Sequence, residues 1–277
     1  SDIALLGFYV AVNGSLVRYN LVDQSIDEYF DTSGVDGPSS SNAARSGSAP
    51  YYYFGGAAAT ITNDADSVTT DGDYTIYKWT DTASTGSYNN NTAQDVAWLV
   101  VGGGGGGGGA LQSADSGGAG GAGGYRTGTA ISLTAGEDYT ITVGAGGAGA
   151  CGNPDATKGS DSSLAGPDIT TITSTGGGFG SNAAGGASGD GGAGGGGGAS
   201  QDGGSGNTPA ITQYTAAGET TSVQGYDGGD GTGGPSACGA GGAGGAGGSN
   251  SVQSGVGGGL GGTGSNNDIT GETVGYA

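Results

Sequence analysis

Eight consecutive glycines, residues 102–109, constrain this chain more than any other feature. They follow a strand-like apolar run, Ala97–Val101, and almost everything after them is rich in glycine. Nine of the 72 glycines lie in residues 1–100, and the other 63 follow. Because glycine loses more backbone freedom on folding than any other residue, such a chain folds only if its glycines serve close packing.

A flexible linker and an ordered structure are the two interpretations of the glycine-rich part. The glycines are phased in threes, as Gly-Gly-X, in residues 117–125 and 241–249. Only 11% of all residues are charged, whereas disordered segments are usually rich in charge. A linker also needs no strand-like segments, yet three of them interrupt the glycine: Tyr139–Val143, Ile169–Thr173 and Ala210–Tyr214. We therefore predict an ordered structure.

A period of three matches the polyproline-II geometry, a left-handed helix with three residues per turn and a rise of about 3.1 Å. With Gly-Gly-X phasing, two of its three faces carry no Cβ, so two such helices can approach backbone to backbone. Their N–H and C=O groups point sideways and can pair between helices, as buried backbone groups require. Collagen, the other period-three structure, needs far more proline than the six residues present. The sequence thus predicts a sheaf of polyglycine-II helices.

The fold class that we expect is all-β with an irregular glycine-rich part. Small antiparallel β units come first, and a sheaf of polyglycine-II helices with interspersed strands and loops follows. The composition places the boundaries of these parts. We expect a β unit for anchoring and assembly in residues 1–56, a second small β unit in 57–101, and the glycine-rich domain in 102–277.

The N-terminal region carries strand patterning and little glycine. Asn13-Gly14 between Ile3–Val12 and Ser15–Leu21 predicts a hairpin with its turn at those two residues. Ser25–Phe30 is interpreted as a short helical turn. Apolar and aromatic side chains at this density are typical of a core or a subunit interface, so we name assembly candidates. They are Ile3, Leu5, Leu6, Phe8, Val10, Tyr51, Tyr52 and Tyr53.

The second region combines strand-like composition with polar turns. Tyr74–Trp79 is rich in β-formers, and Thr70–Asp73 before it has the composition of a turn. Thr80–Asp95 is polar throughout and is predicted as a long loop leading into Ala97–Val101.

The charge and the residue types present exclude several functions. With 25 acidic and 5 basic residues the net charge is −20, which argues against partners that are nucleic acids or anionic membrane surfaces. The chain has no histidine, so Ser-His-Asp and Cys-His catalysis is excluded. The longest apolar run, Ile3–Val12, is too short to cross a bilayer, so we expect no membrane insertion.

Four segments form an ordered series of short motifs: Thr69–Tyr77, Trp98–Gly109, Gly120–Gly128 and Tyr139–Gly147. This series resembles the glycine-rich domain of bacteriophage tail-fibre and related virion surface proteins. The resemblance covers roughly residues 60–277, and residues 21–54 look like segments of phage structural proteins, less specifically. The resemblance implies a place on the virion exterior, and binding of a host receptor by loops between packed polyglycine helices.

Four aspartates, Asp64, Asp66, Asp71 and Asp73, form the closest acidic cluster. A carboxylate pair could hydrolyse glycans, and aspartates with backbone carbonyls could bind Ca²⁺. Solvated turn carboxylates are the third interpretation, and the composition of the segment favours it. No other cofactor is indicated.

Two cysteines, Cys151 and Cys238, lie in the glycine-rich part. Without histidine or a CxxC pair they do not make a usual zinc site. One disulfide between them and two buried free thiols both fit the sequence.

The leading hypothesis is a non-enzymatic phage protein on the virion surface, a tail-fibre-like or capsid-fibre adhesin. Its partners would be other virion proteins, copies of itself, and a host cell-surface glycan or protein. Receptor-contact candidates are Phe179, Asn182, Tyr214, Tyr226 and Asp227. The alternative is a purely structural subunit, either a capsid-decorating protein or an extracellular filament, since the apolar N-terminal strand could complete a neighbour's sheet.

Overall fold

The computed structural model describes residues 7–12, 15–20, 26–31, 62–89, 92–110, 116–151, 156–182, 186–231, 239–242, 244–249 and 259–276. The chain forms two compact units, Ser1–Thr60 and Ile61–Ala277. The sheets are antiparallel, so the predicted all-β class is confirmed. The described residues include no helix long and apolar enough to traverse a bilayer.

The N-terminal unit contains a three-stranded sheet of order β1-β2-β3, made by β1 (Gly7–Val12), β2 (Ser15–Asn20) and β3 (Ile26–Asp31). Val12 pairs with Ser15, which confirms the predicted hairpin; its turn residues lie outside the described part.

The helical turn predicted for Ser25–Phe30 is wrong, because Leu16 of β2 pairs with Phe30 of β3. A six-residue helix is marginal by itself, whereas the open edge of β2 offers a full ladder of hydrogen bonds. Among the assembly candidates, Phe8 and Val10 lie on β1. The other six lie outside the described residues: Ile3, Leu5, Leu6, Tyr51, Tyr52 and Tyr53.

The second unit is built on a five-stranded sheet of order β12-β11-β10-β7-β4. Its strands are β4 (Thr62–Asn63), β7 (Thr85–Asn89), β10 (Asp138–Thr142), β11 (Ser162–Gly166) and β12 (Ile169–Ser174). The long loop predicted for Thr80–Asp95 is wrong, since it contains β7. The composition of β7 is polar, but the strand contains a buried residue, Tyr88, which pairs with Tyr139 of β10.

Three two-stranded ladders and a 3₁₀ turn complete the described elements of this unit. The hairpin of β5 (Ser67–Asp71) and β6 (Tyr74–Lys78) confirms the turn predicted at its tip. The strands β8 (Gln94–Val101) and β9 (Tyr125–Leu133) pair with each other, as do β13 (Ser265–Asn267) and β14 (Val274–Tyr276). The 3₁₀ turn η2 covers Thr215–Ala217.

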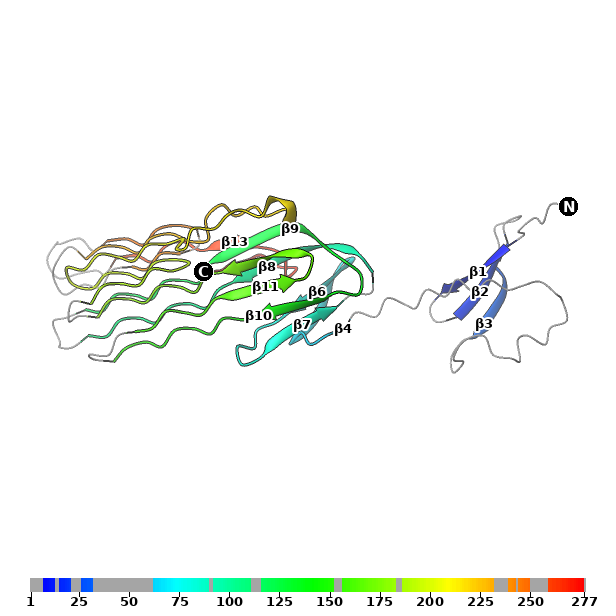
Figure 1. The fold of residues 1–277 in the computed structure, drawn as a ribbon, viewed down its shortest axis with the longest axis horizontal. Helices are drawn as coiled ribbons and strands as arrows, with labels where there is room; N and C mark the ends of the chain where they lie inside the picture. Colours follow the sequence, from blue (N-terminus) through cyan, green and yellow to red (C-terminus); the bar gives the residue numbers. More distant parts are fainter. Residues whose placement is uncertain are drawn as a thin grey trace. The chain divides into compact units, whose positions relative to one another are not determined.

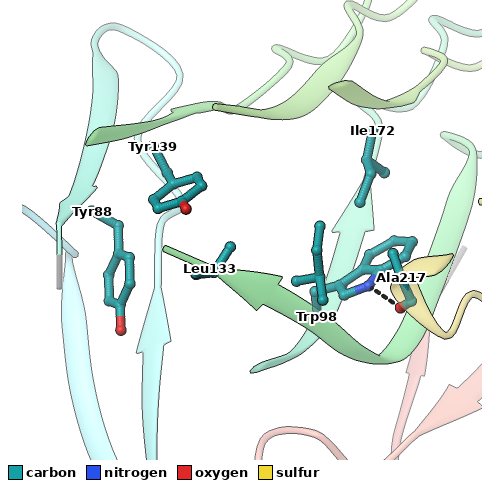
Figure 2. Close-up of a cluster of buried hydrophobic side chains, with 7 residues drawn as sticks. Tyr88, Trp98, Leu133, Tyr139, Ile172 and Ala217 are labelled. Atoms are coloured by element: carbon teal, nitrogen blue, oxygen red, sulfur yellow. Dashed lines mark hydrogen bonds between the residues drawn. The ribbon is translucent and has the colours of Figure 1, made fainter. Parts of the chain in front are cut away.

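The hydrophobic core lies where these sheets meet, and Figure 2 shows its side chains. Trp98 of β8 is buried, and its indole Nε1 donates a hydrogen bond to Ala217 O at 3.0 Å. This bond satisfies the polar atom of the largest core side chain and ties η2 to the sheet. The buried members of the cluster are Tyr88, Trp98, Ile131, Leu133, Tyr139, Ile172 and Ala217.

The glycine-rich segments run side by side away from these sheets, as Figure 1 shows. In residues 102–110, every third N–H donates to one neighbouring segment: Gly102 to Gly124 O, Gly105 to Gly121 O and Gly108 to Gly118 O, at 2.8–2.9 Å. The residues one step further donate to another segment: Gly103 to Ser160 O and Gly106 to Thr157 O. A β-strand alternates between two neighbours, so a period of three marks a different extended structure.

The glycine positions obey the same period. A Cβ added at Gly102, Gly103, Gly105 or Gly106 would lie closer than 3.0 Å to backbone atoms of a neighbouring segment. At Gly104 the nearest atom would be 3.7 Å away, which is an ordinary contact. Two of every three positions therefore have no room for a side chain, as the Gly-Gly-X phasing predicted.

Candidate functional site

A pocket of about 310 Å³ lies between the edge strand β12 and the segment formed by residues 209–214. Its volume falls at the lower end of the about 300–1,000 Å³ typical of small-molecule sites. The lining consists of five threonines, three small or aliphatic residues, one tyrosine, one carboxylate and one guanidinium. The lining residues are Arg126, Asp161, Thr170, Thr171, Thr173, Thr175, Pro209, Ala210, Ile211, Thr212 and Tyr214.

One lining residue, Arg126, belongs to a buried ion pair with Glu219. Arg126 of β9 is 6% exposed and Glu219 is 5% exposed. The guanidinium donates to the carboxylate through two bonds, Nε to Oε1 at 2.7 Å and Nη2 to Oε2 at 2.8 Å. Arg126 Nη1 also donates to Thr173 O of β12 at 3.0 Å. One arginine therefore joins β9, β12 and the segment before Glu219.

Glu219 stays ionised in this setting. Burial acts to raise its pKa, but hydrogen bonds from Arg126 and the Tyr214 backbone N–H outweigh burial, and the pKa is lowered. The Tyr214 N–H lies 2.6 Å from Oε2, and Thr221 Oγ1 donates to Oε1 at 3.1 Å. The carboxylate thus neutralises the arginine and also fixes the backbone of the pocket wall at Tyr214.

The wall of residues 209–214 is not the strand that the sequence predicted for Ala210–Tyr214. Its backbone is held by side chains instead: Gln224 Nε2 donates to Pro209 O at 2.9 Å, and Ile211 N donates to Asn207 Oδ1 at 3.3 Å. The alternating pattern looked strand-like, but these backbone groups bond to side chains instead of to the backbone of a neighbouring strand. The Thr208–Pro209 peptide bond is cis.

Several polar groups of the pocket make no hydrogen bond to the residues that the structure describes. In the part of the chain that the structure describes, none of the five lining threonines uses its hydroxyl in a hydrogen bond. Thr175 among them is only 4% exposed. Asp161 is exposed, and its Oδ1 accepts a hydrogen bond from Gly176 N at 2.8 Å. The pocket therefore presents donors and acceptors that a polar ligand could satisfy.

The five predicted receptor-contact residues do not gather in one place. Tyr214 is half-buried, packs against the core cluster and lines the pocket. Tyr226 is 40% exposed, and Asp227 beside it is exposed while its Oδ1 accepts from Gly206 N. Phe179 is half-buried, and Asn182 is 6% exposed. Only Tyr214 lines the pocket.

Two aspartates of the predicted acidic cluster accept hydrogen bonds from the turn that follows Trp79 and from Trp79 itself. Asp64 Oδ1 accepts from Trp79 Nε1 at 2.9 Å and from Ser87 N at 2.6 Å. Asp66 Oδ2 accepts from Thr80 N, Thr80 Oγ1 and Asp81 N. These bonds, led by those from the Ser87 and Thr80 backbone, lower the pKa of both carboxyls. Asp71 and Asp73 lie at the β5–β6 turn and are exposed.

The geometry at the turn gives no metal centre. The described residues contain no group of three histidine, cysteine, aspartate or glutamate side chains placed to hold a metal ion. Of the two cysteines, Cys151 is exposed with a free thiol, and Cys238 lies outside the described residues.

The sequence reasoning did not single out Arg126 or Glu219 as site residues. They lie 93 residues apart, and neither has a charged neighbour in sequence. The one available signal was scarcity, because the chain has only five basic residues.

Comparison with known protein families identifies the larger part of the chain. A family model described as a glycine-rich domain matches residues 80–275. The matched range holds the core strands from β7 onward, the pocket and the glycine segments. Neither the curated proteins nor the solved structures gave a match. The chain belongs to the family defined by this glycine-rich domain.

Proposed function

We propose that this chain is a non-enzymatic surface-attachment protein of a phage virion, built on a rigid sheaf of polyglycine-II helices. The observation that carries the proposal is the period of three, seen both in the hydrogen bonds of residues 102–110 and in the positions that exclude a Cβ. Polyglycine-II helices have three residues per turn and present their backbone groups in several directions. Such a sheaf needs no conventional hydrophobic core.

The segment of residues 175–181 illustrates why the sheaf would be stiff. Gly177 and Gly180 donate to residues 103 and 106, whereas Gly178 and Ser181 donate to residues 193 and 196. The same segment accepts bonds from Gly118, Gly121 and Gly124. Bonds in several directions mean that one segment cannot bend without breaking contacts to all its neighbours. A stiff support is what a protein needs to present a binding surface at a fixed place.

The virion assignment rests on the resemblance of residues 60–277 to the glycine-rich domains of tail-fibre proteins. The acidic charge of −20 agrees with an exterior protein that avoids nucleic acid. In this proposal residues 1–56 anchor the chain to other virion proteins, and the glycine-rich domain faces the host.

One observation favours the second candidate, a purely structural subunit. The strand β1 lies at the end of the order β1-β2-β3, so its outer edge pairs with no described strand. An open edge can accept a strand from another copy of the chain. Under this candidate the chain would decorate a capsid or form a filament.

Locating the chain on intact particles separates the two candidates. Cross-linking with mass spectrometry and cryo-electron microscopy of virions would show its position. We expect the chain at the distal end of a tail or fibre. A regular lattice over the capsid, or a filament of this chain alone, would favour the structural subunit instead.

A further inference from the structure

We propose that the pocket between β12 and residues 209–214 binds a neutral carbohydrate unit. The inference rests on the proposed function, because it names the class of receptor that the chain would recognise. Three observations support it: the chemical groups of the lining, the pairing of Arg126 with Glu219, and the occupied backbone groups at the edge of β12.

The lining matches the groups that a sugar presents. Five threonine hydroxyls that bond to no group in the described residues can each donate and accept, as ring hydroxyls do. The exposed ones, Thr170, Thr171 and Thr212, lie at the rim, whereas Thr175 is buried. Asp161 adds a carboxylate acceptor. A ligand with many hydroxyl groups would satisfy these positions together.

The opposite wall offers an apolar surface. Pro209, Ile211 and Tyr214 follow one another along the segment and line the pocket. The ring of Tyr214 is held against the core cluster, and its backbone is fixed by Glu219. A sugar ring is apolar on its C–H face and polar at its edge, so it fits a site with one apolar wall and one hydroxyl wall.

The guanidinium favours a neutral ligand over an anion. Arg126 already shares its charge with Glu219 through two hydrogen bonds. Of the two Nη1 hydrogens one is donated to Thr173 O, and the second is free to donate within the described part of the chain. The other charged group of the lining is the carboxylate of Asp161, and the whole chain carries −20. An acidic sugar would meet repulsion with no unpaired cation to offset it.

Contacts within the chain occupy part of the edge of β12. An added strand would need the free backbone groups of this edge. Thr173 O is taken by Arg126, Thr175 N by Gln224 Oε1, and Thr170 N by the Tyr214 hydroxyl. An added peptide strand would have to displace these bonds, which favours recognition through side chains, and therefore a carbohydrate over an extended peptide.

Ligand-observed NMR on the full chain tests this inference. The probes are glucose, galactose, mannose and N-acetylglucosamine, with N-acetylneuraminic acid as the acidic sugar and trialanine as the peptide. We expect saturation transfer to at least one neutral sugar. Thr171→Val together with Thr212→Val should weaken that binding about tenfold, since two hydrogen bonds are lost. Thr142→Val, an exposed threonine of β10 outside the pocket, is the matched control and should bind as the parent does.

The outcomes separate this inference from the proposed function. If no neutral sugar binds, if only the acidic sugar or the peptide binds, or if the double variant binds like the parent, the inference is wrong. The attachment role would still hold if the purified chain blocked virion adsorption. Conversely, the chain could bind a neutral sugar and yet be found only in a capsid lattice. That result would support carbohydrate binding by the pocket and contradict the attachment role.

Discussion

Arg126 and Glu219 are 93 residues apart in the sequence, yet their side chains form a two-bond ion pair with Nε and Oε1 2.7 Å apart. Both side chains are almost fully buried. Taking two charges out of water costs several kcal/mol per ion. The pair persists because each guanidinium nitrogen and both carboxylate oxygens make a hydrogen bond. It joins β9 and β12 to the loop that ends at η2.

Removing one partner of this pair should destabilise the second unit strongly. Arg126→Met leaves a buried carboxylate without its cation, which costs about 3–5 kcal/mol. For a unit of this size that corresponds to a fall in Tm of about 10 °C. Differential scanning calorimetry measures it. The double variant Arg126→Met with Glu219→Leu should lose less than the single one, and an equal or larger loss would contradict the account.

The stability of the second unit should depend on pH through Glu219. Its pKa is lowered in the folded protein from the ordinary value of 4.5. The unfolded chain therefore takes up the proton first as pH falls, and the stabilisation, complete above about 4.5, is lost as pH drops through the folded pKa. Asp64 and Asp66 act with the same sign. Melting curves between pH 7 and pH 3 should show this fall, with a smaller slope for Glu219→Gln; identical slopes would argue against it.

Neighbouring glycines should respond differently to an added methyl group. Gly105→Ala places a Cβ against the Gly178 backbone and should cost about 1–3 kcal/mol through overpacking. Gly104→Ala meets nothing closer than 3.7 Å and should be neutral, or stabilising by up to about 1 kcal/mol, since alanine restricts the unfolded chain. Urea unfolding of both variants measures the difference. Equal effects would mean that the period of three does not govern the packing.

The second unit should fold without the first. All seven buried residues of the core cluster lie within Ile61–Ala277. Residues 61–277 produced alone should therefore melt cooperatively at the same temperature as that unit in the full chain. Circular dichroism checks the melting, and a molten or aggregated product would show that residues 1–60 contribute to its fold.

Local patterns in the sequence predicted much of this fold. The strands around Tyr139 and Ile172 follow β-rich segments, and the phasing of glycine predicted the positions closed to a side chain, such as Gly102 and Gly103. The strand β7 was missed because its composition, Thr-Gly-Ser-Tyr-Asn, is that of a loop, and its pairing with β10 and β4 makes it a strand.

The candidate site was largely beyond the reach of sequence reasoning. Tyr214 was predicted from its place between glycine-rich segments. The pocket, however, also depends on the ion pair between Arg126 and Glu219, which are 93 residues apart in the sequence, and no local pattern predicts that contact. The predicted strand at Ala210–Tyr214 failed for the same reason, since distant side chains hold its backbone.

Competition for host adsorption tests the central claim most directly. Purified full-length chain is mixed with host cells before virions that carry the chain are added, and free virions are counted over time. The account predicts that adsorption slows as the chain concentration rises, while a chain carrying Gly105→Ala and Gly178→Ala, which disturbs the sheaf, loses this effect. Adsorption at an unchanged rate at saturating chain concentration would contradict a role in attachment.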